Sequence, residues 1–168
     1  MNRVQIGVLG TAAFLGVAIF GLTRQAYDKH DLLGVIPGMT YKQAESLSRS
    51  RKWTCQDQPA AHEAVCSTSR GNFTLQYLPD GDQPISRATL ELTKLTDTAQ
   101  VLADDLSGQY RKQPARVEGQ EPVMTFTWDL GGGITLQLQK TAADKADLVI
   151  GNESLQKRRD SAGQGAPK

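Results

Sequence analysis

Apolar and polar residues alternate strictly along several segments of this chain, and such alternation is typical of half-buried β-strands. The clearest segment runs from Met124 to Gln139, where three consecutive glycines at positions 131–133 divide two alternating runs. Folding the chain at these glycines predicts an antiparallel hairpin with one apolar face and one face of threonine and glutamine. The expected register pairs Leu130 with Ile134, Trp128 with Leu136, and Phe126 with Leu138.

Two further hairpins are predicted upstream. Residues 73–78 and 85–93 alternate in the same way, and the Pro-Asp-Gly-Asp-Gln-Pro sequence between them at positions 79–84 is typical of a turn. The expected pairs in this hairpin are Leu78 with Ile85, Leu75 with Ala88, and Phe73 with Leu90. A strand that begins at Trp53 and a strand over residues 64–69 form the other hairpin.

Amphipathic spacing predicts two helices. Thr40 followed by Gln43 has the spacing of a capping box, and Asp97 followed by Gln100 predicts a second helix N-terminus. The apolar stripes of the two helices are Tyr41, Ala44 and Leu47, and Ala99, Leu102, Ala103, Leu106 and Tyr110. The expected fold class is α+β: an antiparallel sheet of hairpins, with a last strand at residues 148–150, covered on one face by two helices.

An uncharged apolar segment precedes this domain. Residues from Val4 to Leu22 include no Asp, Glu, Lys or Arg, and as a helix they would extend about 28 Å, close to the hydrocarbon thickness of a bilayer. We expect one N-terminal transmembrane helix; the alternative is a secretory signal peptide that is cleaved. The predicted organisation is an anchor or signal with a polar spacer at residues 1–33, an exported α+β domain at 34–155, and a disordered basic tail at 156–168.

The two cysteines bear on the compartment. In the first hairpin of the domain, the register that pairs Asp57 with Ala64 also brings the cysteines opposite each other. Cys55 and Cys66 would then lie within reach of a disulfide; the alternative is two reduced thiols, as expected in the cytosol. With the export-type N-terminus, this pairing predicts a disulfide and a single-pass protein of the bacterial inner membrane with its domain in the periplasm. Cleavage of a signal would instead yield a secreted protein.

Composition and charge argue against several classes of function. The chain has 168 residues, and its 19 lysines and arginines nearly balance its 18 aspartates and glutamates, whereas duplex-binding proteins usually carry a strong basic excess. Two cysteines outside a CxxC pair exclude a four-ligand zinc knuckle. His30 and His62 are the only histidines, and neither a G-x-S-x-G nor an H-E-x-x-H motif is present. We therefore expect no catalytic residue, no cofactor, no metal and no nucleic-acid partner.

One segment resembles a known superfamily. The sequence Ile-Pro-Gly-Met-Thr-Tyr-Lys-Gln-Ala-Glu-Ser-Leu at residues 36–47 is followed by a Trp-x-Cys strand from Trp53 and by a second cysteine. Over residues 34–69, this order resembles the helix-then-hairpin unit of the superfamily of the β-lactamase inhibitor protein and the small lipoprotein of the outer-membrane assembly machine. The resemblance implies a non-catalytic binding platform. Unlike the lipoprotein, this chain has no cysteine after its apolar segment, so lipid cannot be attached there.

These observations predict a non-catalytic, membrane-anchored periplasmic module that binds or assembles another protein through the polar face or the loops of its sheet. The partner would be membrane-associated or periplasmic, and residues 4–22 would contact the membrane. Two alternatives stay open. One is an accessory subunit of a membrane complex that is held mainly by its transmembrane helix, and the other is a hydrolase or redox enzyme.

Overall fold

The computed structural model describes residues 30–164 of the chain. Its helices are α2 (Tyr41–Ser50), the short 3₁₀ helix η2 (Pro59–Ala61), α3 (Ala99–Tyr110) and α4 (Glu153–Gln164). Its strands are β1 (Thr54–Gln58), β2 (Glu63–Thr68), β3 (Gly71–Tyr77), β4 (Ile85–Thr93), β5 (Arg116–Gln120), β6 (Val123–Gly131), β7 (Ile134–Ala142) and β8 (Lys145–Asn152). The predicted membrane span from Val4 to Leu22 lies outside the described residues, and within them no helix is long and apolar enough to cross a membrane.

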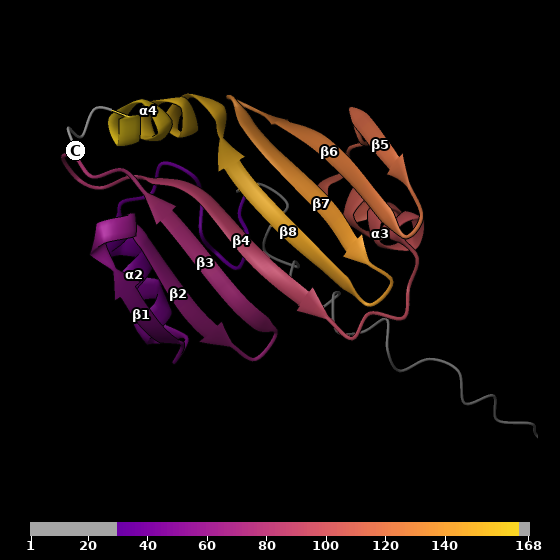
Figure 1. Cartoon of the computed structure of the whole chain (residues 1–168), viewed down its shortest axis with the longest axis horizontal. Helices are drawn as coiled ribbons and strands as arrows, with labels where there is room; N and C mark the ends of the chain where they lie inside the picture. Colours follow the sequence, from indigo (N-terminus) through magenta and orange to yellow (C-terminus); the bar gives the residue numbers. More distant parts are fainter. Residues whose placement is uncertain (1–29, 165–168) are drawn as a thin grey trace, which may run out of the picture.

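In this part of the chain, eight strands form one antiparallel sheet in the order β1-β2-β3-β4-β8-β7-β6-β5. The first four strands follow one another as neighbours, and the last four do so in the opposite direction, so the two halves meet at β4 and β8 (Figure 1). The short final strand predicted at residues 148–150 is therefore the middle of β8, at the centre of the sheet.

One face of the sheet, which we call the inner face, carries the hydrophobic core. Its buried residues are Ala64, Cys66, Phe73, Leu75, Tyr77, Ala88, Leu90, Phe126, Trp128, Leu136, Leu138, Ala146, Leu148 and Ile150. α2 packs on this core through Ala44, and α3 packs on it through Leu102 and Leu106. The Trp128 indole N–H donates a buried hydrogen bond to the Ser107 hydroxyl of α3 (3.1 Å). The predicted α+β fold, with two helices on the apolar face of an antiparallel sheet, is confirmed.

The predicted hairpin registers are confirmed along the strands and wrong beside two turns. The confirmed pairs are Asp57–Ala64, Cys55–Cys66, Phe73–Leu90, Leu75–Ala88, Phe126–Leu138 and Trp128–Leu136. Two predicted pairs are replaced: Leu78–Ile85 by Tyr77–Ile85, and Leu130–Ile134 by Gly131–Ile134. At each of these places the register shifts within one strand, as a β-bulge does, and simple alternation does not reveal such a shift.

The predicted N-cap is confirmed for one helix and wrong for the other. The capping box of Thr40 and Gln43 at the start of α2 is confirmed, with both reciprocal hydrogen bonds present. The N-cap of α3 is Thr98 rather than Asp97. In addition, Glu121 in the β5–β6 turn accepts a hydrogen bond from the Ala99 N–H (2.7 Å), and its negative charge is favourable at this end of the helix dipole.

The segment predicted as a disordered tail from residue 156 is instead helical as far as Gln164, because it belongs to α4. α4 lies on the opposite face from α2 and α3. Gly151 follows the buried inner-face residue Ile150 and so points to the other side of the sheet, where a Cβ would meet the side chain of Gln156. Figure 1 shows α4 at the end of the sheet where β3 and β8 finish and β4 begins. Arg158 of α4 forms an ion pair with Asp80 in the β3–β4 loop (3.0 Å).

A buried lysine joins the β7–β8 turn to the loop that precedes α3. The side chain of Lys140 on β7 is almost fully buried on the inner face. Its ammonium group donates hydrogen bonds to the carbonyl oxygens of Asp97 (2.8 Å) and Ala143 (2.6 Å). Because buried charge is costly without such partners, these two bonds hold the loop before α3 against the β7–β8 turn.

We expect Lys140→Met to lower the free energy of unfolding by about 2 kcal/mol, because methionine fills the space but leaves two carbonyl groups without their donor. The measurement is urea denaturation followed by far-UV circular dichroism. The control is Lys145→Met in the exposed start of β8, which should change the free energy of unfolding by about 0.5 kcal/mol or less. Equal losses in the two variants would contradict this role of Lys140.

Candidate binding surface

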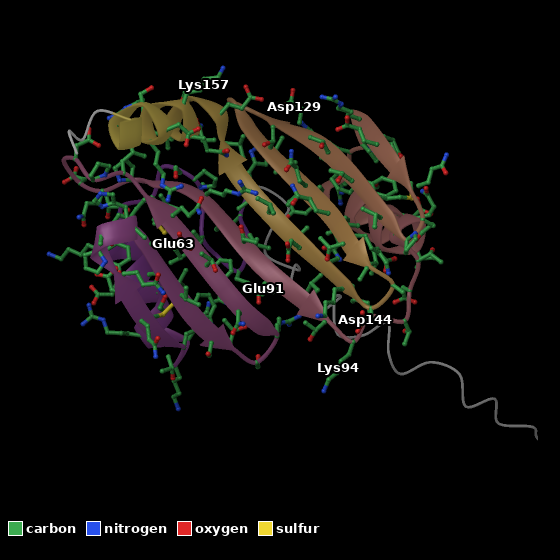
Figure 2. All side chains as sticks on the ribbon, in the orientation of Figure 1. Glu63, Glu91, Lys94, Asp129, Asp144 and Lys157 are labelled. Carbon is green, nitrogen blue, oxygen red and sulfur yellow. A yellow bond between two sulfur atoms is a disulfide. The ribbon has the colours of Figure 1, made fainter. Side chains whose placement is uncertain are left out.

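The second face of the sheet, which we call the outer face, is polar over most of its area. Its side chains alternate with those of the core and are half-buried or exposed: Thr74, Gln76, Arg87, Thr89, Glu91, Thr125, Thr127, Thr135, Gln137, Gln139 and Asp147. Figure 2 is a view onto the sheet in which side chains of the outer face, such as Glu63 and Glu91, project from the strands. Val149 is buried between its cross-strand neighbours Thr89 and Gln137.

α4 covers only one end of the outer face. Its anchoring contacts reach the residues around η2 and β2: Arg159 donates a hydrogen bond to the Ala61 carbonyl (3.2 Å) and lies 4.0 Å from the Glu63 carboxylate. Asn152 caps the helix, since its side-chain oxygen accepts hydrogen bonds from the N–H groups of Ser154 and Leu155. No helix passes in front of β6, β7 or β8 in Figure 1, so this part of the outer face is open among the described residues.

A row of polar side chains crosses the outer face from β3 to β7. The Asn72 side chain donates a hydrogen bond to the Glu91 carboxylate (3.0 Å). Glu91 lies directly opposite Asp147 across β4 and β8, and Asp147 lies opposite Gln139 on β7. Partial burial raises the pKa of Asp147, the negative charge of Glu91 raises it further, and Arg87 opposes the shift. Two carboxylates on neighbouring strands therefore repel each other at the centre of this face.

The histidines do not meet on this surface. His62 lies beside β2 with its ring centre 5.9 Å from that of Tyr77, and the Tyr77 hydroxyl donates a hydrogen bond to Asp57 (2.8 Å). Tyr41 packs on Tyr77 at 4.4 Å, and burial together with Asp57 raises the pKa of Tyr41 to about 12. The aromatic cluster of Tyr41, His62 and Tyr77 ties α2 to β1 and β3, and sequence spacing alone did not group its members. The other histidine, His30, is the first described residue.

What the outer face offers is hydrogen bonding. Threonine hydroxyls and glutamine amides both donate and accept, and a sheet holds them at fixed spacing. Within residues 30–164, no group of three or more histidine, cysteine, aspartate or glutamate residues is arranged to hold a metal ion. The absence of a catalytic site and a cofactor, expected from sequence, stays a prediction.

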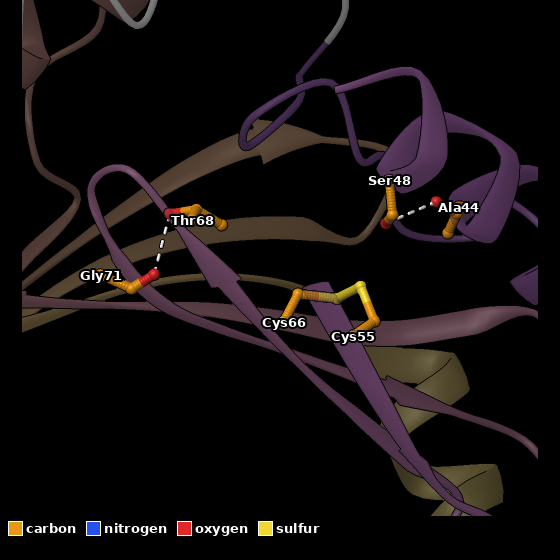
Figure 3. The surroundings of a disulfide bond; sticks show 6 residues. All are labelled: Ala44, Ser48, Cys55, Cys66, Thr68 and Gly71. Atoms are coloured by element: carbon orange, nitrogen blue, oxygen red, sulfur yellow. Dashed lines mark hydrogen bonds between the residues drawn. A yellow bond between two sulfur atoms is a disulfide. The ribbon is translucent and has the colours of Figure 1, made fainter. Parts of the chain in front are cut away.

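The predicted disulfide is present at the edge of the sheet. Cys55 and Cys66 are joined with an S–S distance of 2.08 Å across β1 and β2 (Figure 3). The Cys66 side chain is fully buried, whereas Cys55 lies on the exposed edge strand. The bond therefore fastens β1, whose residues are all exposed, to the core below α2.

Comparisons of the chain with protein-family models, with curated proteins and with solved structures found no match. The superfamily resemblance of residues 34–69 thus stays a prediction from the sequence.

We expect the variant Cys55→Ala/Cys66→Ala to lose about 3 kcal/mol of unfolding free energy, the chain-entropy value for a closed loop of this size. Urea denaturation of the oxidised wild type and of the variant measures the difference. Reductant should destabilise the wild type by a similar amount and leave the variant unchanged. A wild-type stability that is insensitive to full reduction would contradict a stabilising disulfide.

A second prediction concerns pH. Since the pKa of Asp147 is raised in the folded state, its ionised form is less favourable there than in the unfolded chain. The resulting cost is present at neutral pH and disappears once the pH falls below the usual aspartate pKa of 3.8. Asp147→Asn should therefore raise the free energy of unfolding at pH 7 by about 0.5 kcal/mol and have no effect at low pH.

Denaturation curves at several pH values check this expectation, with Asp144→Asn in the exposed β7–β8 turn as the matched control. The control should show no gain at any pH. If Asp147→Asn destabilises the protein at neutral pH, the carboxylate makes a favourable contact instead.

Proposed function

We propose that this protein is a non-catalytic, membrane-anchored periplasmic module that binds another protein through the outer face of its sheet. The observation that carries the proposal is the open, polar area formed by β6, β7 and the parts of β4 and β8 that lie beyond α4, which no described element covers. The opposite face of the same strands is fully occupied by the core and by α3. The outer face is therefore a rigid surface: the strands fix the positions of its side chains, but these side chains do not form part of the core.

The size of this area suits a protein partner. Four strands of eight or nine residues span an area about 20 Å wide and 30 Å long, or roughly 600 Å², of which α4 covers one end. The open remainder is smaller than the roughly 800 Å² that each partner contributes to a standard interface, but it is large enough to form the centre of one. Interfaces of non-obligate complexes are about as polar as the rest of a protein surface, so threonine and glutamine are suitable contact residues.

Rigidity supports affinity. Each outer-face side chain projects from a strand that is hydrogen-bonded on both sides, except at the two sheet edges. Threonine has a single side-chain torsion to restrict, so binding through these residues costs little conformational entropy. The polar row around Glu91 and Asp147 adds a negative centre, which favours a partner that presents a basic or amide-rich surface there.

Two features support the compartment in the proposal. The disulfide between Cys55 and Cys66 persists in an oxidising environment such as the periplasm. The apolar segment at residues 4–22 would supply the membrane anchor. The resemblance of residues 34–69 to a superfamily of binding platforms supports a role in binding rather than catalysis.

The experiment is site-specific photo-crosslinking of the full-length chain in bacterial membranes. A photo-reactive residue is placed at Thr89, Thr127 or Gln137 on the outer face, and at Ser46 of α2 or Asp104 of α3 as matched exposed controls. We expect the three outer-face positions to yield an adduct with one and the same protein, identified by mass spectrometry. The helix positions should not yield that adduct.

The outcomes separate the hypotheses. Adducts from the helix positions with equal yield, or none from the outer face, would contradict binding through this surface. If a partner copurifies with the full chain but crosslinks only at residues 4–22, the protein is an accessory subunit held by its membrane segment. Turnover of a substrate that is lost on outer-face substitution would indicate an enzyme.

A further inference from the structure

The described sheet is open and has two edge strands, β1 and β5. Edge strands present unpaired backbone N–H and C=O groups, and proteins usually protect them or pair them with another strand. β1 is fastened by the disulfide and contacts α2. β5 has no such protection, and all five of its residues, Arg116–Gln120, are exposed.

Three exposed apolar side chains belong to elements at the β5 end of the sheet. Among the described residues, the large hydrophobic side chains with high exposure are Val101 (46%), Val117 (52%) and Val123 (55%). Val117 is in β5, and Val123 begins β6 on the other side of the β5–β6 turn. Val101 lies in the first turn of α3, which the hydrogen bond from Ala99 to Glu121 joins to the same turn. Val117 lies opposite Phe126 and so points to the inner face, whereas Val123 lies opposite Gln120 and points to the outer face. An exposed apolar side chain on an unpaired edge strand, as Val117 is, indicates a contact surface.

We propose that β5 pairs in antiparallel orientation with β5 of a second copy of this chain, about a two-fold axis at Val117. In this register Val117 lies opposite its own copy. Arg116 of each chain then lies opposite Glu118 of the other, on the outer face. The two sheets become one continuous sheet, and each exposed edge is covered by the other.

Charge selects this register. A two-fold axis at Glu118 would place two carboxylates opposite each other, and an axis at Arg116 would do the same with two guanidinium groups, both of which are unfavourable. Only the axis at Val117 pairs opposite charges and two apolar side chains together. Within one chain Arg116 already forms an exposed ion pair with Glu118 (2.8 Å), so both groups can exchange that partner for the one across the axis at small cost.

Symmetry also favours a second copy over another edge. Pairing β5 with β5 of a second copy gives a closed dimer. Pairing β5 with β1 of the next chain would leave a free edge at each end, so chains could add without limit. The open part of the outer face on β6, β7 and β8 stays accessible in the dimer. The proposal is therefore independent of the protein-binding function above, and each can fail without the other.

The first test is crosslinking by cysteine substitution in the full-length chain in bacterial membranes. Val117→Cys places two thiols directly opposite each other on the two-fold axis, within reach of a disulfide or a short bis-maleimide. Val123→Cys, which is equally exposed, is the matched control. We expect a crosslinked dimer with Val117→Cys and little with Val123→Cys. Equal yields, or no dimer with Val117→Cys, would overturn the proposal.

The second test is a charge swap, measured by sedimentation of the purified full-length chain over a range of concentrations. Arg116→Glu or Glu118→Arg alone places like charges opposite each other at two symmetric positions, and we expect dimerisation to weaken about tenfold. The double variant Arg116→Glu/Glu118→Arg restores opposite charges and should restore dimerisation. A dimer that is unaffected by the single variants, a monomer in the wild type, or open-ended oligomers would each overturn pairing through β5.

Discussion

The pairing of β4 with β8 is the contact on which the rest of this fold depends. Among the described strands, it alone joins the hairpins of the first half of the chain to those of the second. On the inner face it sets Leu90 against Leu148 and Ala88 against Ile150, which makes one continuous core beneath α2 and α3. The two strands are distant in the sequence, so closing them costs chain entropy that only joint burial of both halves offsets.

This arrangement leaves the two faces of the sheet in unequal states. Helices α2 and α3 occupy the inner face, while α4 reaches only one end of the outer face. The outer side chains that remain are threonine, glutamine and a few charges, which water can solvate and a partner can replace. The polar outer face and the apolar core are thus two consequences of one strand pattern, and burial of the core holds the outer side chains in place.

Two polar residues show how strictly the fold sorts charge. Lys140 is at an inner-face position, and it is tolerated there because two backbone carbonyls accept its hydrogen bonds. Asp147 is at an outer-face position, and its ionised form is disfavoured because the side chain is partly buried and because Glu91 lies directly opposite it on β4. Burial alone would predict the larger cost for the charge of Lys140, which is the more deeply buried of the two side chains. What decides is whether each charge has a partner of the right kind.

The sequence by itself determined the features that depend on neighbours within one hairpin or one helix. Alternation identified the inner and outer faces of β3, β4, β6 and β7, local spacing identified the capping box at Thr40, and the hairpin register paired Cys55 with Cys66. It also separated the threonine and glutamine face from the apolar face. It did not reveal the opposition of Glu91 and Asp147, because that depends on β8 lying beside β4.

Only the tertiary structure decided the remaining features. β8 is central in the sheet, β5 forms an edge, and residues 153–164 form a helix against the outer face. The N-cap of α3 is shared between Thr98 and the distant Glu121. The physical reason is that the periodicity of a strand or helix is a property of consecutive residues. Which element packs against it or caps it depends on how the whole domain buries its apolar surface.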